Sequence, residues 1–96
     1  MLNVEITYAG LIRSAVRRRR EHLEIARGAT LGQLLEEVVR HHGPAARPYL
    51  LDDDVDLLPH AIISVNGTGV RDMAAPLGGE SATVQILVLS PMMIGG

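Results

Sequence analysis

The chain has 96 residues, of which 47% are hydrophobic, and its formal net charge is −2. A chain of this length and composition is long enough for one domain with a modest core, which excludes a disordered protein. The net charge is too small to imply a polyanionic partner.

The residue types that are missing narrow the function further. Cysteine is absent, which excludes disulfides, thiolate metal sites and a cysteine nucleophile, and favours a cytoplasmic location. Tyr8 and Tyr49 are the only aromatic residues, so base-stacking nucleic-acid modules are not expected. No apolar run reaches membrane-spanning length, and no signal-peptide pattern opens the sequence. We therefore expect neither a nucleic acid nor a membrane as partner.

The first part of the chain predicts two strands. Apolar and polar residues alternate over residues 2–9, which is the period of a half-buried strand. Alternation returns at residues 22–26. Residues 10–21 between them are expected to form a wide hairpin connection with a basic tip at Arg17–Arg20.

One helix is predicted from residue 30 onward. Thr30 and Gln33 have the spacing of a capping box. Apolar residues then recur with helical spacing on one face, namely Leu31, Leu34, Leu35, Val38 and Val39. Gly43-Pro44 should end the helix.

The second half predicts a short helical turn and three more strands. The turn is expected within residues 45–51. A strand at residues 61–65 leads into Asn66-Gly67, a strong hairpin signal, and a short return strand. Residues 82–89 form the last predicted strand. Its residues are apolar on both faces, which indicates a central strand beside the first one.

The order of these elements indicates an α+β fold of the β-grasp (ubiquitin-like) type. We expect a mixed sheet of four to five strands that packs on one main helix. Residues 1–90 should form the β-grasp domain, and residues 91–96 a flexible C-terminal Gly-Gly tail.

The tail itself has a specific chemical character. Pro91 would stop ladder pairing, and Gly95-Gly96 is the thinnest backbone available, able to thread a narrow tunnel in a partner. The alternative from the residues alone is a frayed terminus.

Four motifs in this order resemble the ubiquitin-like sulfur carriers, the MoaD/ThiS family, which includes the small subunit of molybdopterin synthase and the thiamine-pathway carrier. The motifs are Tyr8–Arg13, Gly28–Leu35, Val65-Asn66-Gly67, and Pro91 with Gly95-Gly96. The sequence departs from the family where Met92, Met93 and Ile94 replace small tail residues.

The resemblance implies a protein cosubstrate, not an enzyme. A ubiquitin-activating-type adenylyltransferase would use ATP and magnesium to adenylate Gly96, and a sulfurtransferase or cysteine desulfurase would supply sulfur for a C-terminal thiocarboxylate. A client synthase, most simply one of molybdopterin synthesis, would accept the sulfur. The chain itself would bind no cofactor. Cysteine, thiamine and tRNA-thiolation carriers share this plan, and conjugation to proteins through Gly96 is the other alternative.

The candidate site residues follow from this resemblance. Gly96 would carry the reacting carboxyl carbon, and the tail behind it comprises Pro91, Met92, Met93, Ile94 and Gly95. The expected partner interface is an apolar sheet patch near the tail, with Leu87, Leu89, Ile63 and Val65 as candidates.

Other clusters of chemically active residues are expected to be structural. No Ser–His–acid order or phosphate loop is present. No metal site is expected: Asp52–Asp56 lacks the glycine and distal glutamate of a calcium loop, and the histidines at 41, 42 and 60 are taken as helix-end and loop residues. Arg17–Arg20 could contact an acidic partner or RNA, or be a solvated loop tip.

Overall fold

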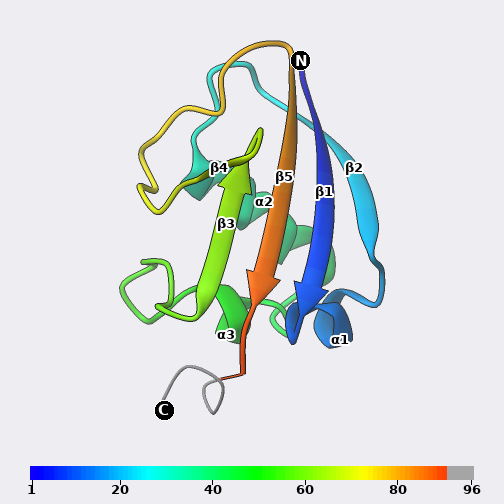
Figure 1. Ribbon diagram of the computed structural model, residues 1–96, viewed down its shortest axis with the longest axis vertical. Coiled ribbons are helices and arrows are strands. Elements are labelled where there is room, and N and C mark those ends of the chain that lie inside the picture. Colours follow the sequence, from blue (N-terminus) through cyan, green and yellow to red (C-terminus); the bar gives the residue numbers. More distant parts are fainter. Residues whose placement is uncertain (91–96) are drawn as a thin grey trace.

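The computed structural model describes residues 1–90, which form a five-stranded sheet with three helices (Figure 1). The strands are β1 (Leu2–Gly10), β2 (Arg20–Ile25), β3 (Ala61–Val65), β4 (Thr68–Gly69) and β5 (Ser81–Val88). The helices are α1 (Ile12–Val16), α2 (Leu31–His42) and α3 (Arg47–Leu50).

The first and last strands lie side by side in the middle of the sheet. The strand order is β2-β1-β5-β3-β4. β1 pairs in parallel with β5, and the other neighbouring strands are antiparallel. The predicted central position of the last strand is confirmed, and the arrangement is that of an α+β β-grasp fold.

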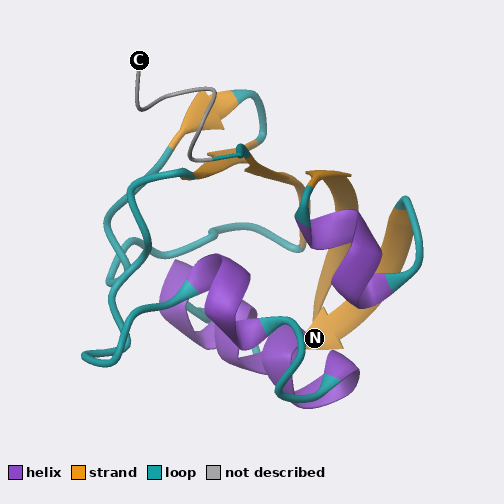
Figure 2. Ribbon diagram, turned by 90° about the horizontal axis from the view of Figure 1, so that it is seen from below, coloured by secondary structure: helices purple, strands orange, loops and turns teal. Residues whose placement is uncertain are grey.

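The main helix α2 covers one face of this sheet (Figure 2). Its predicted capping box is present: the Gln33 backbone N–H donates to Thr30 Oγ1 at 3.2 Å, and the Thr30 N–H donates to Gln33 Oε1 at 2.9 Å. Gly43, at φ 78°, ends the helix and donates its N–H to the Val39 carbonyl. Two of the helix's first free N–H groups are thus satisfied locally.

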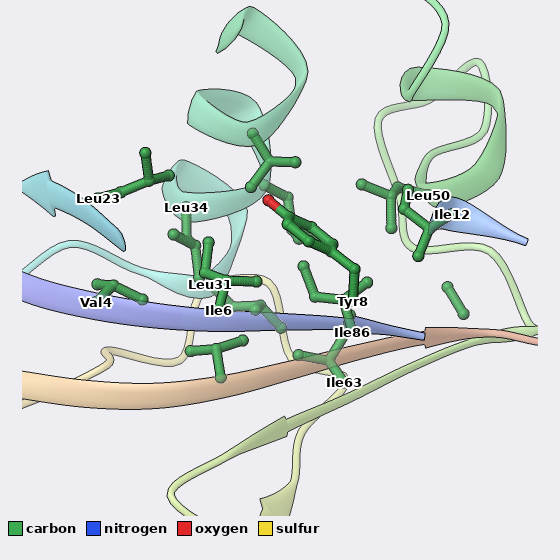
Figure 3. Close-up of a cluster of buried hydrophobic side chains, with 14 of the residues drawn as sticks. Val4, Ile6, Tyr8, Ile12, Leu23, Leu31, Leu34, Leu50, Ile63 and Ile86 are labelled. Carbon is green, nitrogen blue, oxygen red and sulfur yellow. The ribbon is translucent and has the colours of Figure 1, made fainter. Parts of the chain in front are cut away.

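The core lies between α2 and the inner face of the sheet (Figure 3). It is aliphatic apart from Tyr8, as the composition requires. Alternate residues of each strand point inward, and Leu77 fills the core from the long connection before β5, as predicted. The fully buried side chains include Leu2, Val4, Ile6, Leu31, Leu34, Leu35, Ile63 and Ile86.

The hairpin between β3 and β4 has the predicted turn. Asn66 and Gly67 both have positive φ, 51° and 86°, which matches the twist of a two-residue hairpin. Asn66 is also bonded to β5: its N–H donates to the Thr83 carbonyl, and its side-chain oxygen accepts from the Thr83 N–H.

The connection from β1 to β2 differs from the prediction, because it contains the helix α1. No side chain caps this helix at Leu11, and its buried residues Ile12 and Val16 attach it to the core. Arg17, at φ 58°, ends it in the left-handed region. Five residues with few sequence signals form a helix here because packing stabilises them.

One arginine holds the long connection before β3. The Arg71 guanidinium donates to the carbonyls of Ala61, Leu57 and Leu58 at 2.9 to 3.1 Å. The loop around Asp52–Asp56 is ordered locally, since the Asp52 carboxylate accepts from the backbone of Asp54 and Asp56. Within residues 1–90, no helix has the length and apolar character needed to cross a membrane.

Candidate functional site at the end of the central strand

The end of β5 is held on both sides by the rest of the fold. The Leu11 N–H donates to the Val88 carbonyl at 2.9 Å, just past the end of β1. On the other side, the Leu89 N–H donates to the His60 carbonyl at 3.0 Å, just before β3. These bonds fix the direction in which the chain leaves the sheet towards residue 91.

Gly10 makes this close packing possible. It has a φ of 75°, and a Cβ built on it would lie 2.1 Å from the Val88 carbonyl oxygen. No side chain fits at that distance, and L-residues rarely adopt that φ. The glycine of the Tyr8–Arg13 stretch therefore has a structural reason that the sequence alone does not reveal.

The predicted tail begins beyond this anchored point. Gly96, the residue expected to react, lies outside the described residues, as do Pro91, Met92, Met93, Ile94 and Gly95. Their roles stay predictions. The division into a domain of residues 1–90 and a tail of residues 91–96 stays one as well.

An apolar row crosses the outer face of the sheet near the same end. Leu87 is half-buried, and its neighbours in register are Ala9 on β1 and Ile62 on β3. Ile62 is 44% exposed, although it was not among the predicted interface residues. Leu89 is half-buried just beyond the strand.

The structure places the other two interface candidates on the opposite face. Ile63 is only 1% exposed and pairs with the buried Ile86, and Val65 packs against the core. Both therefore face α2 and offer no sheet surface to a partner. Ala61, Ile62 and Ile63 are all apolar, so no alternation showed which side faces solvent.

A polar cluster joins β1, β2 and α2 on the helix side of the sheet. The Tyr8 hydroxyl donates to Glu21 Oε1 at 2.7 Å, and His42 Nε2 lies 2.7 Å from the same oxygen. Because a carboxylate only accepts, His42 presents its Nε2–H to Glu21. Arg18 lies 3.4 Å from the other carboxylate oxygen.

This cluster shifts the protonation of two of its members. Burial, reinforced by the hydrogen bond to Glu21, raises the pKa of Tyr8 well above its ordinary value. Burial alone would raise the pKa of Glu21, but the hydrogen bonds from His42 and Tyr8 outweigh it and lower that pKa. The cluster thus holds a neutral phenol beside a carboxylate, which suits a structural link between sheet and helix.

The other predicted structural clusters remain separate from one another. Among residues 1–90, no three His, Cys, Asp or Glu side chains gather in a way that could hold a metal ion. His42 belongs to the Glu21 cluster, whereas His41 lies 3.7 Å from Glu37 on the same helix.

Comparison with known proteins shows the fold class. No protein-family model matches the sequence, and no curated protein matches it either. Small archaeal modifier protein 1 from Haloferax volcanii superposes with a TM-score of 0.82 at 18% identity, over 94% of this chain and 100% of that one. The chain has the ubiquitin-like β-grasp fold.

Two further β-grasp structures have printed functions of different kinds. The putative molybdopterin converting factor subunit 1 from Pyrococcus furiosus matches with a TM-score of 0.65 at 22% identity, over 94% of this chain and 100% of that one. A chain of the Amycolatopsis orientalis BexX/CysO complex matches with a TM-score of 0.70 at 20% identity, over 91% and 96%. These likenesses extend over nearly the whole of each chain, so the fold has no added or missing domain relative to them.

Proposed function

We propose that this chain is a sulfur-carrier protein that acts through the carboxyl carbon of Gly96. An activating partner would adenylate Gly96, sulfide would displace AMP, and the resulting thiocarboxylate would donate sulfur to a biosynthetic client, with molybdopterin synthesis as the proposed pathway.

The anchored end of β5 is the observation that supports this proposal best. The strand that precedes the Gly-Gly segment lies in the centre of the sheet and is bonded to Leu11 and His60 at its exit. A short peptide that leaves a rigid body at a fixed point is presented to a partner at a small entropic cost. Glycine at positions 95 and 96 would let that peptide enter a narrow channel.

The proposal assigns the chemistry to the partners. A carboxylate is a poor acyl donor until its oxygen becomes part of a better leaving group, and adenylation by an ATP-using partner supplies that group. The chain contributes the acyl end and the surface around it. The apolar row of Ala9, Leu87 and Ile62 is the proposed contact for such partners.

Intact mass spectrometry tests the proposal. We expect that incubation with a ubiquitin-activating-type enzyme, ATP, magnesium and sulfide raises the mass by one oxygen-to-sulfur exchange. Deletion of Gly96 should abolish the increase, and Glu24→Gln, a change at an exposed position of β2, should not. Sulfur loading that survives the deletion of Gly96 would show that the proposal is wrong.

The client is tested separately from the loading step. The thiocarboxylated protein is mixed with the large subunit of a molybdopterin synthase and its precursor, and product formation is measured. The preference for this client rests on the Tyr8–Arg13 stretch. Product formation only with a cysteine, thiamine or tRNA-thiolation client would move the protein to that pathway.

Conjugation to proteins is the second candidate function. The archaeal neighbour with a TM-score of 0.82 is a modifier protein, and that likeness favours this alternative. The chain contains no lysine, so it could be attached to a target but could not form side-chain-linked chains of itself. Heavier bands of tagged protein in a cell lysate that depend on Gly96 would support conjugation.

A further inference from the structure

An open hollow beside α1 is lined mainly by arginine. It has a volume of about 580 Å³, and its lining residues are Gly10, Arg13, Ser14, Arg17, Arg18 and Arg19. No carboxylate lines it. The hollow lies at the end of the sheet where β1 runs into α1, the end at which the β5 arrow also points (Figure 1).

Most of the positive charge in this hollow is not neutralised by the rest of the fold. Within residues 1–90, Arg13, Arg17 and Arg19 make no ion pair. Arg18 approaches Glu21 at 3.4 Å with its side chain still 56% exposed. Four arginines without an intervening acid therefore face one hollow of a protein whose net charge is −2. This local charge needs an anionic counterpart.

The backbone that carries these arginines is ordered by packing. Buried Ile12 and Val16 hold α1 against the core, and the Arg17 N–H donates to the Arg13 carbonyl at 2.8 Å. The Arg19 carbonyl accepts from the Tyr8 N–H at 2.7 Å, which fixes the return of the loop to β2. The side chains thus project from a defined turn and not from a loose loop tip, so less entropy is lost when they bind.

We infer that this hollow binds a small ligand with two or more linked phosphoryl groups. The planar fork of arginine donates two parallel hydrogen bonds to phosphoryl oxygens, which favours phosphate over a compact monovalent anion. The volume lies in the range of small-ligand sites. No aromatic side chain lines the hollow, so recognition is of the phosphate chain and not of a base.

Titration of the protein alone with inorganic tripolyphosphate, followed by amide NMR shifts, tests this inference. We expect saturable shifts confined to residues 10–20, and affinity that falls as salt is added. ATP should bind similarly to tripolyphosphate, and orthophosphate should bind more weakly. Stronger binding of ATP than of tripolyphosphate would show that a nucleoside contributes, against the inference.

Charge-matched variants separate this site from general electrostatic attraction. Arg13→Gln with Arg19→Gln should weaken tripolyphosphate binding at least about tenfold, because each arginine supplies charge-assisted hydrogen bonds. Arg47→Gln, an exposed arginine of α3 outside the hollow, should leave binding unchanged. All three side chains are exposed, so the variants are expected to fold, which circular dichroism checks.

Three outcomes would overturn the inference. One is the absence of saturable shifts with tripolyphosphate, and another is an equal loss of affinity in Arg47→Gln. The third is binding of single-stranded RNA without binding of tripolyphosphate, which would make the hollow part of an RNA surface. None of these measurements involves Gly96 or an activating enzyme, so this inference and the proposed function can fail independently.

Discussion

Replacement of Gly10 by alanine should disturb the fold at the base of the tail more than any other single glycine change in the described chain. The left-handed backbone at φ 75° costs an L-residue about 1–2 kcal/mol. In addition, the new Cβ would lie 2.1 Å from the Val88 carbonyl oxygen, so β1 and β5 must separate. That movement would break the Leu11–Val88 hydrogen bond and leave a buried acceptor unpaired, at about 1–3 kcal/mol.

The sum is a loss of about 2–5 kcal/mol, a large part of the about 5–15 kcal/mol by which domains are usually stable. Urea unfolding followed by circular dichroism measures it. Gly28→Ala is the matched control, because Gly28 has a similar φ of 80° but nothing within 4 Å of the new Cβ. We expect the control to lose only the backbone cost of about 1–2 kcal/mol. Equal losses in the two variants would refute the idea that close packing against Val88 matters.

The remaining predictions concern the polar cluster and the helix cap. Since the pKa of Glu21 is lower in the folded state, its carboxylate stabilises the fold above its ordinary pKa of 4.5, and that stability is lost as the pH falls through the folded value. Urea titrations across acid pH should therefore show a steeper loss for the wild type than for Glu21→Gln; parallel curves would contradict this. The pKa of Tyr8 is raised, so its contribution is full below its ordinary value of 10.0 and declines as the pH rises beyond it. Tyr8→Phe should flatten that alkaline decline, and a decline unchanged in this variant would assign it to other groups. Thr30→Ala should lower the free energy of unfolding by about 1 kcal/mol through loss of the capping box, whereas Thr68→Ala, exposed on β4, serves as control. An effect at Thr30 no larger than at Thr68 would mean that the cap adds nothing.

Much of the fold could be predicted because local patterns agree with the tertiary structure. The Thr30–Gln33 box, the Asn66-Gly67 turn and the apolar last strand each have a short-range physical cause, and each is confirmed. The helix α1 could not be predicted, since its stability comes from burial of Ile12 and Val16 and not from caps or length.

The surfaces were harder to predict than the elements. Ile62 and Ile63 are adjacent and chemically identical, so only the pairing of Ile63 with Ile86 decides which of them is buried. The contact of Tyr8 and His42 with Glu21 depends on strand register and on where α2 ends, which are long-range properties. The reacting end itself lies outside residues 1–90, so the sequence remains its only description.

The central position of β5 has a consequence for the order in which the protein matures. During synthesis this strand emerges after all other described elements, and until then β1 and β3 each lack the neighbour that joins them. The pairing of β1 with β5 links residues about as distant in the chain as any in the fold, so it should form late. A chain that stops before residue 81 has no complete sheet. Folding and display of the segment after residue 90 are therefore coupled: an activating enzyme that recognises the sheet would meet that segment only on molecules that have finished folding.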